Sequence, residues 1–175
     1  MNQKERFTYH YHARAACFEG AFAGVMWSAA DISARNLDAG PLEVTLISMA
    51  PGVAQLFSLF ATGYISRFDP KKLLLWSSFI GRLPLLGMLF FSGVWPFIFL
   101  LTIQAFAMVP ITATWNTILR NNYGDKTRGM LYGKAARYSA LVSGIVMLGV
   151  GWWLDRDPGA ISWVYPIAAI SGVMA

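Results

Sequence analysis

Two charged residues, Glu19 and Arg82, stand inside long apolar stretches and are the first candidates for chemistry. An ionisable side chain within a bilayer is costly, and by default it marks proton movement or pairing with a solute. Glu19 could serve in this way, or it could simply pair with Arg14, about one helical turn away. Arg82 lies about 16 Å along a helix from Lys71, near the middle of a bilayer, where it needs a partner. For Arg82, a structural ion pair is the favoured interpretation and solute contact is the alternative.

A polar and aromatic stripe follows one face of an expected helix later in the chain. Gln104, Met108, Thr112 and Trp115 recur at helical spacing, and Asn116 stands beside them. Such a stripe suits solute binding in a cavity. Hydrogen bonding between membrane helices explains Gln, Thr and Asn equally well, so both interpretations stay open.

The sequence offers no complete set of groups for metal binding or catalysis. His10 and His12 stand two apart in a polar stretch with no Cys or carboxylate cluster, which is an incomplete ligand set. Asp125 and the acidic residues of 155–157 fall outside any recognised catalytic motif. We therefore expect no metal, no cofactor and no enzyme activity.

Composition excludes a water-soluble fold for most of the chain. Of the 175 residues, 56% are hydrophobic and only 13% are charged, whereas a soluble domain has about a quarter of its residues charged. Between Lys72 and Arg120 lie 47 residues in which Arg82 is the only charge. A lipid bilayer accommodates such a stretch because its interior is apolar. The bilayer is thus the first expected partner.

Six apolar segments are long enough, or nearly so, to cross a bilayer as helices, which takes roughly 20 residues. Their apolar runs are continuous rather than alternating, and backbone groups in lipid must bond within each segment, so helices are expected rather than strands. The sequence predicts an all-α, polytopic transmembrane bundle in a single domain over residues 1–175. The expected helices are 15–33, 44–66, 73–92, 96–119, 131–154 and 159–175.

The sixth segment is short. As a helix, residues 158–175 would span about 27 Å, barely the apolar thickness of a bilayer. No Lys or Arg follows the segment to anchor it. We therefore expect five complete helices, a truncated sixth helix and a longer parent protein.

Basic residues set the expected orientation, because Lys and Arg concentrate in cytoplasmic loops. With a cytoplasmic N-terminus, eleven basic residues lie inside and two, Arg35 and Arg156, lie outside. We expect a multi-pass protein of the plasma (inner) membrane with a cytoplasmic N-terminus. The basic residues gather at segment ends and form no stripe, so nucleic acid is not an expected partner. The inside residues are Lys4, Arg6, Arg14, Arg67, Lys71, Lys72, Arg120, Lys126, Arg128, Lys134 and Arg137.

The loop after the second segment partly matches a transporter pattern, G-x-L-x-D-R-x-G-R-R/K. Over residues 63–72 it reads GYISRFDPKK. Arg67 takes the acidic position, Pro70 takes the second glycine position, and Asp69 is the candidate for the displaced carboxylate. The positions that match are Gly63, Ile65, Lys71 and Lys72.

A second basic loop, NNYGDKTRG over residues 121–129, leads into a glycine-rich segment. With six segments and these two basic loops, the chain resembles the N-terminal half of a major facilitator superfamily transporter. The resemblance implies that the first and fourth helices line a central cavity. It also implies a partner, either a missing C-terminal half or a second copy of the chain. It further implies a gating loop that contains Gly63, Arg67, Asp69, Lys71 and Lys72.

The resulting hypothesis is secondary active transport of a small solute by alternating access, coupled to an ion or a proton. The candidate solute or coupling residues are Glu19, Gln104, Met108, Thr112, Trp115 and Asn116. A membrane scaffold or assembly protein is the alternative, although a pure scaffold gains little from buried charges such as Glu19 and Arg82. A membrane-embedded lipid-modifying enzyme is less favoured, because the acidic residues form no cluster.

Overall fold

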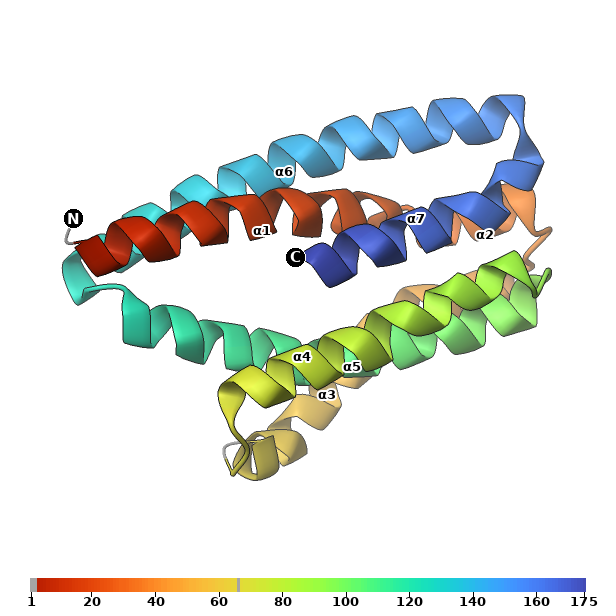
Figure 1. Ribbon diagram of the computed structural model, residues 1–175. Coiled ribbons are helices and arrows are strands. Elements are labelled where there is room, and N and C mark those ends of the chain that lie inside the picture. Colours follow the sequence, from red (N-terminus) through yellow and green to blue (C-terminus); the bar gives the residue numbers. More distant parts are fainter. Residues whose placement is uncertain (1–2, 66) are drawn as a thin grey trace.

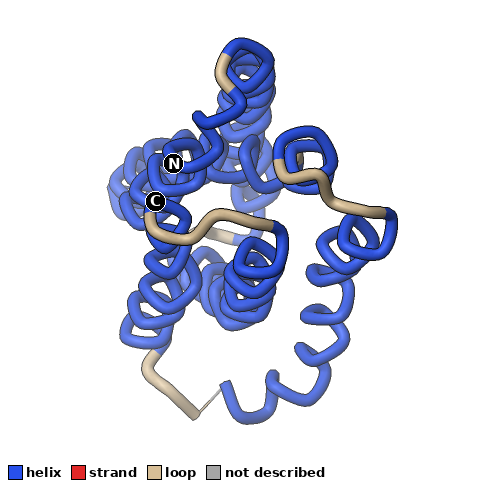
Figure 2. Tube along the Cα trace, turned by 90° about the vertical axis from the view of Figure 1, so that its right-hand side faces the viewer, coloured by secondary structure: helices blue, strands red, loops and turns tan. Residues whose placement is uncertain are grey.

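Every regular element in the described part of the chain is helical. The structure is a computed structural model that describes residues 3–65 and 67–175, without the side chains at 59, 61, 62, 64 and 65. Short connections join the helices (Figure 2). The all-α fold class predicted from the sequence is confirmed. In chain order the elements are α1 (Gln3–Trp27), α2 (Ala29–Asn36), α3 (Pro41–Ile65), α4 (Pro70–Arg82), the 3₁₀ helix η1 (Leu83–Leu89), α5 (Val94–Asn122), α6 (Asp125–Arg156), the 3₁₀ helix η2 (Pro158–Ala160) and α7 (Ile161–Met174).

Three helical segments of the described chain are long and apolar enough to cross a membrane, by length and composition. They are Pro70–Leu89, Val94–Asn122 and Asp125–Arg156. The segment Pro158–Met174 is apolar but shorter. Segments of this length and hydropathy are typical of a membrane protein.

The first predicted helix, 15–33, is wrong at its start and in its continuity. Helix α1 already includes Gln3, and the residues of its first turn, Gln3, Lys4, Glu5 and Arg6, are good helix formers. It ends at Trp27, and α2 follows after a break at Ser28. The Ser28 hydroxyl donates to the carbonyl of Gly24 at 3.1 Å and to that of Val25 at 3.0 Å. Bonds of this kind compete with the helical ladder and bend helices.

The third predicted helix, 73–92, changes from an α-helix to a 3₁₀ helix halfway. Helix α4 begins at Pro70, and the 3₁₀ helix η1 takes over from Leu83 to Leu89. Pro84 has no N–H to continue the α-helical hydrogen bonds, which explains the change.

The remaining helices differ from prediction mainly at their ends. Helix α3 starts at Pro41 rather than residue 44, and residue 66 lies outside the described residues. Helices α5 and α6 extend beyond 96–119 and 131–154 at both ends: Val94 and Trp95 precede the predicted start of α5, and polar residues continue α5 at its C-terminal end and α6 at both ends. The sixth predicted helix divides into η2 and α7.

The helices form two layers (Figure 1). Helix α1 packs against α6 and α7 in one layer, and α5 packs against α3 and α4 in the other. The layers meet where η1 and α4 contact α7. They lie close together at the end that holds α2 and diverge toward the N-terminus of α1 (Figure 1).

Small residues let helices of the same layer approach closely. A Cβ on Gly20 would lie 2.4 Å from the Ser139 carbonyl oxygen, and one on Gly24 would lie 2.6 Å from that of Ser143. The α1–α6 seam therefore requires glycine at both positions, as in other close helix pairs of membrane proteins. The α3–α5 seam is also built from small or short residues, namely Ala50, Ala54, Ala105 and Val109.

A large apolar cluster joins the two layers at the end that holds α2. Phe97 of α5 is fully buried and meets the ring of Tyr165 of α7 edge-on, with centroids 4.8 Å apart. Phe22, Leu85 and Leu154 bring α1, η1 and α6 into the same cluster. We call this region, the buried cluster around Phe97 and Tyr165, the packed end.

Candidate functional site

Glu19 of α1 and Arg82 of α4 form an ion pair between the two layers, with Arg82 Nη2 donating to Glu19 Oε2. The Arg82 side chain is 3% exposed and that of Glu19 is 33% exposed. The Arg82 guanidinium also lies over the Phe22 ring, 5.1 Å from its centroid. Gly172 of α7 makes room for this arrangement, because a Cβ there would lie 2.8 Å from Arg82 Cδ. The pair is thus held by three helices.

Arg82 keeps most of its hydrogen-bonding capacity unused. A guanidinium has five N–H donors. Among the described residues, the bond to Glu19 is the only one that Arg82 makes, and its buried Nε has no partner. Buried donors without acceptors are uncommon in folded proteins, and each one costs free energy. The site therefore holds a buried cation with an unsatisfied donor.

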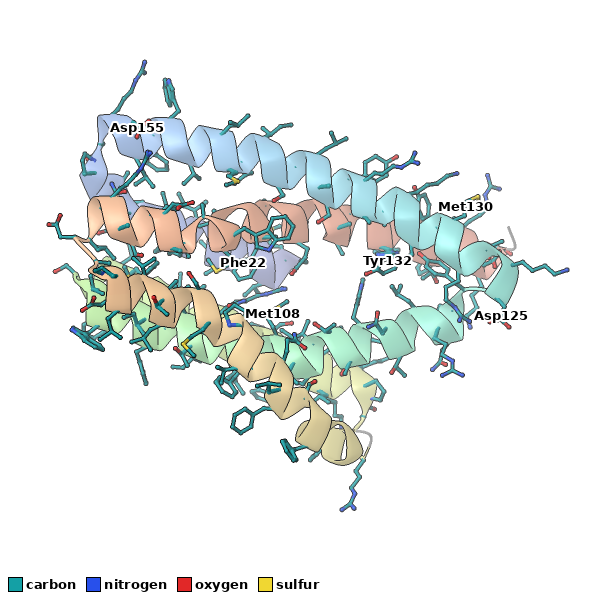
Figure 3. The ribbon with its side chains drawn as sticks, turned by 180° about the vertical axis from the view of Figure 1, so that it is seen from behind. Phe22, Met108, Asp125, Met130, Tyr132 and Asp155 are labelled. Atoms are coloured by element: carbon teal, nitrogen blue, oxygen red, sulfur yellow. The ribbon has the colours of Figure 1, made fainter. Side chains whose placement is uncertain are left out.

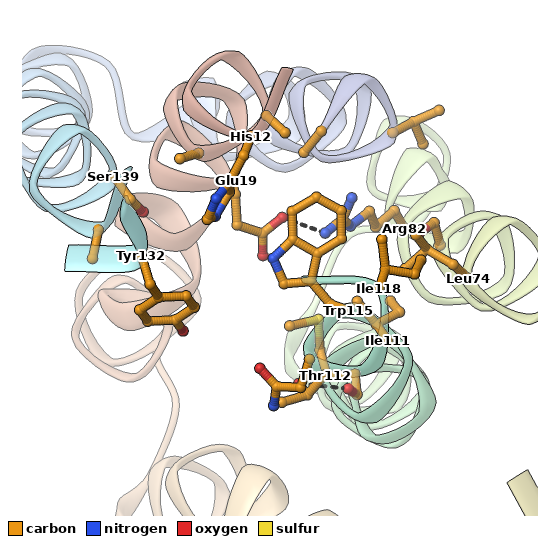
Figure 4. Close-up of a pocket in the computed structure, with 18 of the residues that line it drawn as sticks. His12, Glu19, Leu74, Arg82, Ile111, Thr112, Trp115, Ile118, Tyr132 and Ser139 are labelled. Atoms are coloured by element: carbon orange, nitrogen blue, oxygen red, sulfur yellow. Dashed lines mark hydrogen bonds and ion pairs between the residues drawn. The ribbon is translucent and has the colours of Figure 1, made fainter. Parts of the chain in front are cut away.

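The pair borders a cavity of about 600 Å³. The cavity lies between α1 and α6 on one side and α4 and α5 on the other, and Figure 4 shows the pair directed into it. Its walls are largely apolar, with Ala15, Leu74, Ile111 and Val173 among the lining residues. The polar and aromatic lining residues are His12, Glu19, Trp27, Lys71, Ser78, Arg82, Thr112, Trp115, Asn116, Tyr132 and Ser139.

Most of the stripe predicted on the fourth segment faces this cavity. Met108, Thr112, Trp115 and Asn116 of α5 all line it, whereas Gln104 does not. The Thr112 hydroxyl donates to the Met108 carbonyl at 2.9 Å, so only its oxygen remains free to accept a bond. Tyr132 lies between α6 and α5 (Figure 3). The cavity thus offers an aromatic and weakly polar wall opposite the ion pair.

His12 anchors an aromatic group beside the cavity. Its Nδ1 is 2.9 Å from the Tyr123 hydroxyl, and its ring lies 5.5 Å from the Trp115 ring and 5.9 Å from the Tyr132 ring, measured between centroids. Burial lowers the pKa of His12, which favours the neutral ring. Burial, with a smaller contribution from Tyr9, raises the pKa of Tyr123 to about 12.

Sequence reasoning missed His12 as a cavity residue. His12, Ala16 and Glu19 recur at spacings of four and three, which places them on one face of a helix. This spacing predicts that His12 shares a face with Glu19 only if the helix begins well before residue 15, as α1 does. The described residues hold no group of three or more His, Cys, Asp or Glu side chains that could bind a metal ion.

The predicted gating loop leads to the cavity through Lys71. Asp69 caps α4, because its carboxylate accepts the backbone N–H groups of Lys71 at 2.8 Å and of Lys72 at 3.3 Å. Lys71 lines the cavity, while Gly63, Arg67, Asp69 and Lys72 are exposed and do not.

The structure thus brings part of the predicted set together and leaves part of it outside. The predicted residues at the cavity are Glu19, Lys71, Arg82, Met108, Thr112, Trp115 and Asn116. Arg82, rather than Arg14, is the ion-pair partner of Glu19. In comparisons with known proteins, no family model matches the chain, and neither a curated protein nor a solved structure is significantly similar to it.

Proposed function

We propose that the chain is a secondary active transporter of a small solute, which binds beside the Glu19–Arg82 pair and crosses by alternating access. The observation that carries this proposal is the cavity of about 600 Å³ that contains a buried ion pair. Charged side chains at membrane depth are retained where they serve a solute or ion pathway. The packed end beyond the pair would close the route on one side.

An internal repeat in the helix contacts supports the proposal. We take α1, α3 and α4–η1 as the first three spans, and α5, α6 and α7 as the last three. The main helix contacts of the first set then match those of the second. Helix α1 packs against α6 as α5 packs against α3, and α1 against α7 as α5 against α4, while the third and sixth spans contact each other. Repeats of this kind are typical of secondary transporters, whose solute sites lie at repeat interfaces.

In this proposal all six segments cross the plasma membrane, the N-terminus is cytoplasmic, and the chain corresponds to the N-terminal half of a major facilitator superfamily transporter. A C-terminal half or a second copy would supply the opposite wall of the route. Helix α6 offers a surface for such a partner, because a Cβ on Gly133, Gly144 or Gly151 would meet nothing within 4 Å.

The same open surface on α6 favours the second candidate, a membrane scaffold that packs against other proteins. A scaffold has no use for a buried ion pair beside a cavity, so variants of that pair distinguish the two functions. Glu19 is also the candidate coupling residue. Its protonation would release Arg82, so a solute that carries a negative charge could then bind there and cross together with the proton.

The test uses the full chain in sealed lipid vesicles loaded with the pH-sensitive dye pyranine. A panel of organic acids, amines and sugars is added outside, and internal pH is followed together with uptake of labelled solute. We expect at least one class to move protons or to accumulate, and Glu19→Gln and Arg82→Gln to abolish this. Arg35→Gln is the matched control, because Arg35 forms an exposed pair with Asp155 away from the cavity. Movement that survives both cavity variants would refute the proposed site, and no movement of any class would refute transport.

A further inference from the structure

We infer that the cavity binds an amphipathic organic anion, a carboxylate with an apolar body, whose head group replaces or joins Glu19 on Arg82. This inference rests on the proposed function, since it names the class of solute, but its binding test does not require transport. The two observations that carry it are the unused donors of Arg82 and the apolar walls around them.

The head group is inferred from Arg82. Its side chain is 97% buried, and one bond to Glu19 is its only hydrogen bond within the described chain. Guanidinium groups bind carboxylates through two parallel N–H bonds, whereas Glu19 takes only one. The Glu19 carboxylate therefore occupies the place that a ligand carboxylate would take, which shows that this end of the cavity accepts such a group. An incoming carboxylate would complete the coordination that Glu19 leaves unfinished.

The charge balance of the cavity also favours an anion. Among its lining residues, Arg82 and Lys71 carry positive charge and Glu19 carries negative charge. Burial favours the neutral form of His12, which adds no charge. One added anion brings the lining side chains to neutrality, whereas an added cation would leave their surplus at two positive charges in a confined space. Lys71, on the first turn of α4, also provides a positive charge where α4 begins.

The body of the ligand is inferred from the walls. Leu74, Leu75, Ile111, Ile118 and Val173 present aliphatic surface, and the charged side chains of the lining are those of Glu19, Lys71 and Arg82. A cavity of about 600 Å³ is large enough for a drug-sized ligand. A small inorganic anion would leave this apolar surface unused, so an aliphatic or aryl carboxylate is the better fit.

The binding test compares three molecules with the same body and different head groups. Phenylbutyrate, phenylbutylamine and phenylbutanol are titrated by calorimetry into the full chain in a neutral maltoside detergent. We expect saturable binding of phenylbutyrate and at least about tenfold weaker binding of the other two, because the protonated amine offers Arg82 no acceptor and the alcohol offers one uncharged oxygen instead of a carboxylate. Equal binding of all three would mean apolar partitioning, and preferred binding of the amine would mean a cation site; either result overturns the inference.

Variants of the pair sharpen the test, because they are expected to act in opposite directions. Arg82→Gln should weaken phenylbutyrate binding by about tenfold or more, whereas Glu19→Gln should tighten it by several-fold, since the internal competitor is removed. Arg35→Gln should leave binding unchanged. If Arg82→Gln does not fold, Arg82→Lys keeps the charge but loses the bidentate geometry, and it should bind more weakly than the unaltered protein. Weaker phenylbutyrate binding to Glu19→Gln would overturn the inference.

The outcome separates this inference from the proposed function. Selective, Arg82-dependent phenylbutyrate binding without movement of any solute across vesicles would leave the anion site standing and refute transport. Transport of an amine or a sugar without phenylbutyrate binding would support transport and refute the anion site.

Discussion

The two ends of the molecule are built from the same helices but held together differently. Helix α5 is buried at Phe97 and Leu101 in the packed end, and it lines the cavity at Thr112 and Asn116 further along. Helix α1 runs in the opposite direction: it lines the cavity at Glu19 and enters the packed end further along the chain. The Glu19–Arg82 pair borders the cavity close to Phe22 of the packed end. The comparison shows how one set of helices can be closed at one end and hollow at the other.

At the other end, which we call the open end, polar contacts and a small apolar cluster that includes Tyr9, Tyr123 and Leu131 join α1 to α5 and α6. Glu5 accepts hydrogen bonds from the Gly124 N–H at 3.1 Å and the Thr127 hydroxyl at 2.7 Å, at the start of α6. Lys4 Nζ donates to the Asn121 carbonyl at 3.1 Å. A few hydrogen bonds and a small cluster are easier to break and remake than the large cluster of the packed end. The open end is therefore the one expected to move.

The largest predicted effect on stability comes from breaking the packed end. Phe97→Ala should lower the free energy of unfolding by about 3–5 kcal/mol, because it removes a fully buried ring and leaves a cavity. Phe99→Ala on the same helix is the matched control, since Phe99 is 65% exposed and its loss should change little. Thermal unfolding in detergent measures both. Equal effects of the two variants would mean that the packed end is not a core.

The second prediction concerns the α1–α6 seam, which continues through both ends. Gly20→Ala should cost about 1–3 kcal/mol of stability, because its Cβ would lie 2.4 Å from the Ser139 carbonyl oxygen. Gly144→Ala on α6 should be neutral or stabilise by up to about 1 kcal/mol, since its Cβ would meet nothing within 4 Å. The same unfolding measurement applies. A harmless Gly20→Ala substitution would contradict this close approach of α1 to α6.

A smaller effect is expected from the open end itself. Glu5→Gln keeps an acceptor for Gly124 and Thr127 but removes the negative charge at the start of α6, which should cost about 1 kcal/mol. Amide hydrogen exchange should then rise in residues 3–14 and 124–128 and stay unchanged in the packed end. Asp155→Asn, which breaks the exposed pair with Arg35 at 3.5 Å, is the control. Exchange that rises equally at both ends would show that the two ends are not independent.

The smallest predicted effect is on pH dependence at the open end. His12 precedes the predicted first span, and burial lowers its pKa from the ordinary value of 6.5. The unfolded chain therefore binds a proton below pH 6.5 that the folded protein does not. The stability linked to neutral His12 is complete above pH 6.5 and is lost as the pH falls toward the lowered pKa.

Melting temperatures at pH 7.5 and pH 5.5, chosen on either side of the His pKa of about 6.5, measure this effect. The unaltered protein should lose stability on acidification, and His12→Gln should lose less. His10→Gln is the control, because His10 is exposed. Identical pH profiles for His12→Gln and the unaltered protein would mean that neutral His12 does not contribute to the pH dependence of stability.

The helical class of the fold could be predicted from the sequence, because continuous apolar runs leave helices as the only choice in lipid. Helix boundaries were less predictable. The break at Ser28 depends on where its hydroxyl bonds, and the start of α1 at Gln3 is accompanied by the contacts of Lys4 and Glu5 with distant residues. Apolar content carries no signal for either feature.

The candidate site was predictable in its parts but not in its pairing. Glu19 and Arg82 were conspicuous as charges in apolar stretches, yet they are 63 positions apart in the sequence, and only the packing of α1, α4 and α7 brings them together. Gln104 fits the helical spacing of the stripe on α5, but the direction of a helix face toward a cavity is set by its neighbours, and Gln104 lies outside the lining. The pairing of distant residues and the direction of a helix face depend on tertiary structure, so local sequence does not predict them.

The most direct test of the transport route is cysteine accessibility at two positions of α5. Asn116→Cys at the cavity and Leu101→Cys in the packed end are made separately with Cys17→Ser, and vesicles of both orientations are treated with a membrane-impermeant maleimide. A route open at one end predicts that Asn116→Cys reacts from the cytoplasmic side only and that Leu101→Cys reacts from neither side. Failure of Asn116→Cys to react from either side, or equal reaction of both positions, would contradict the proposed route.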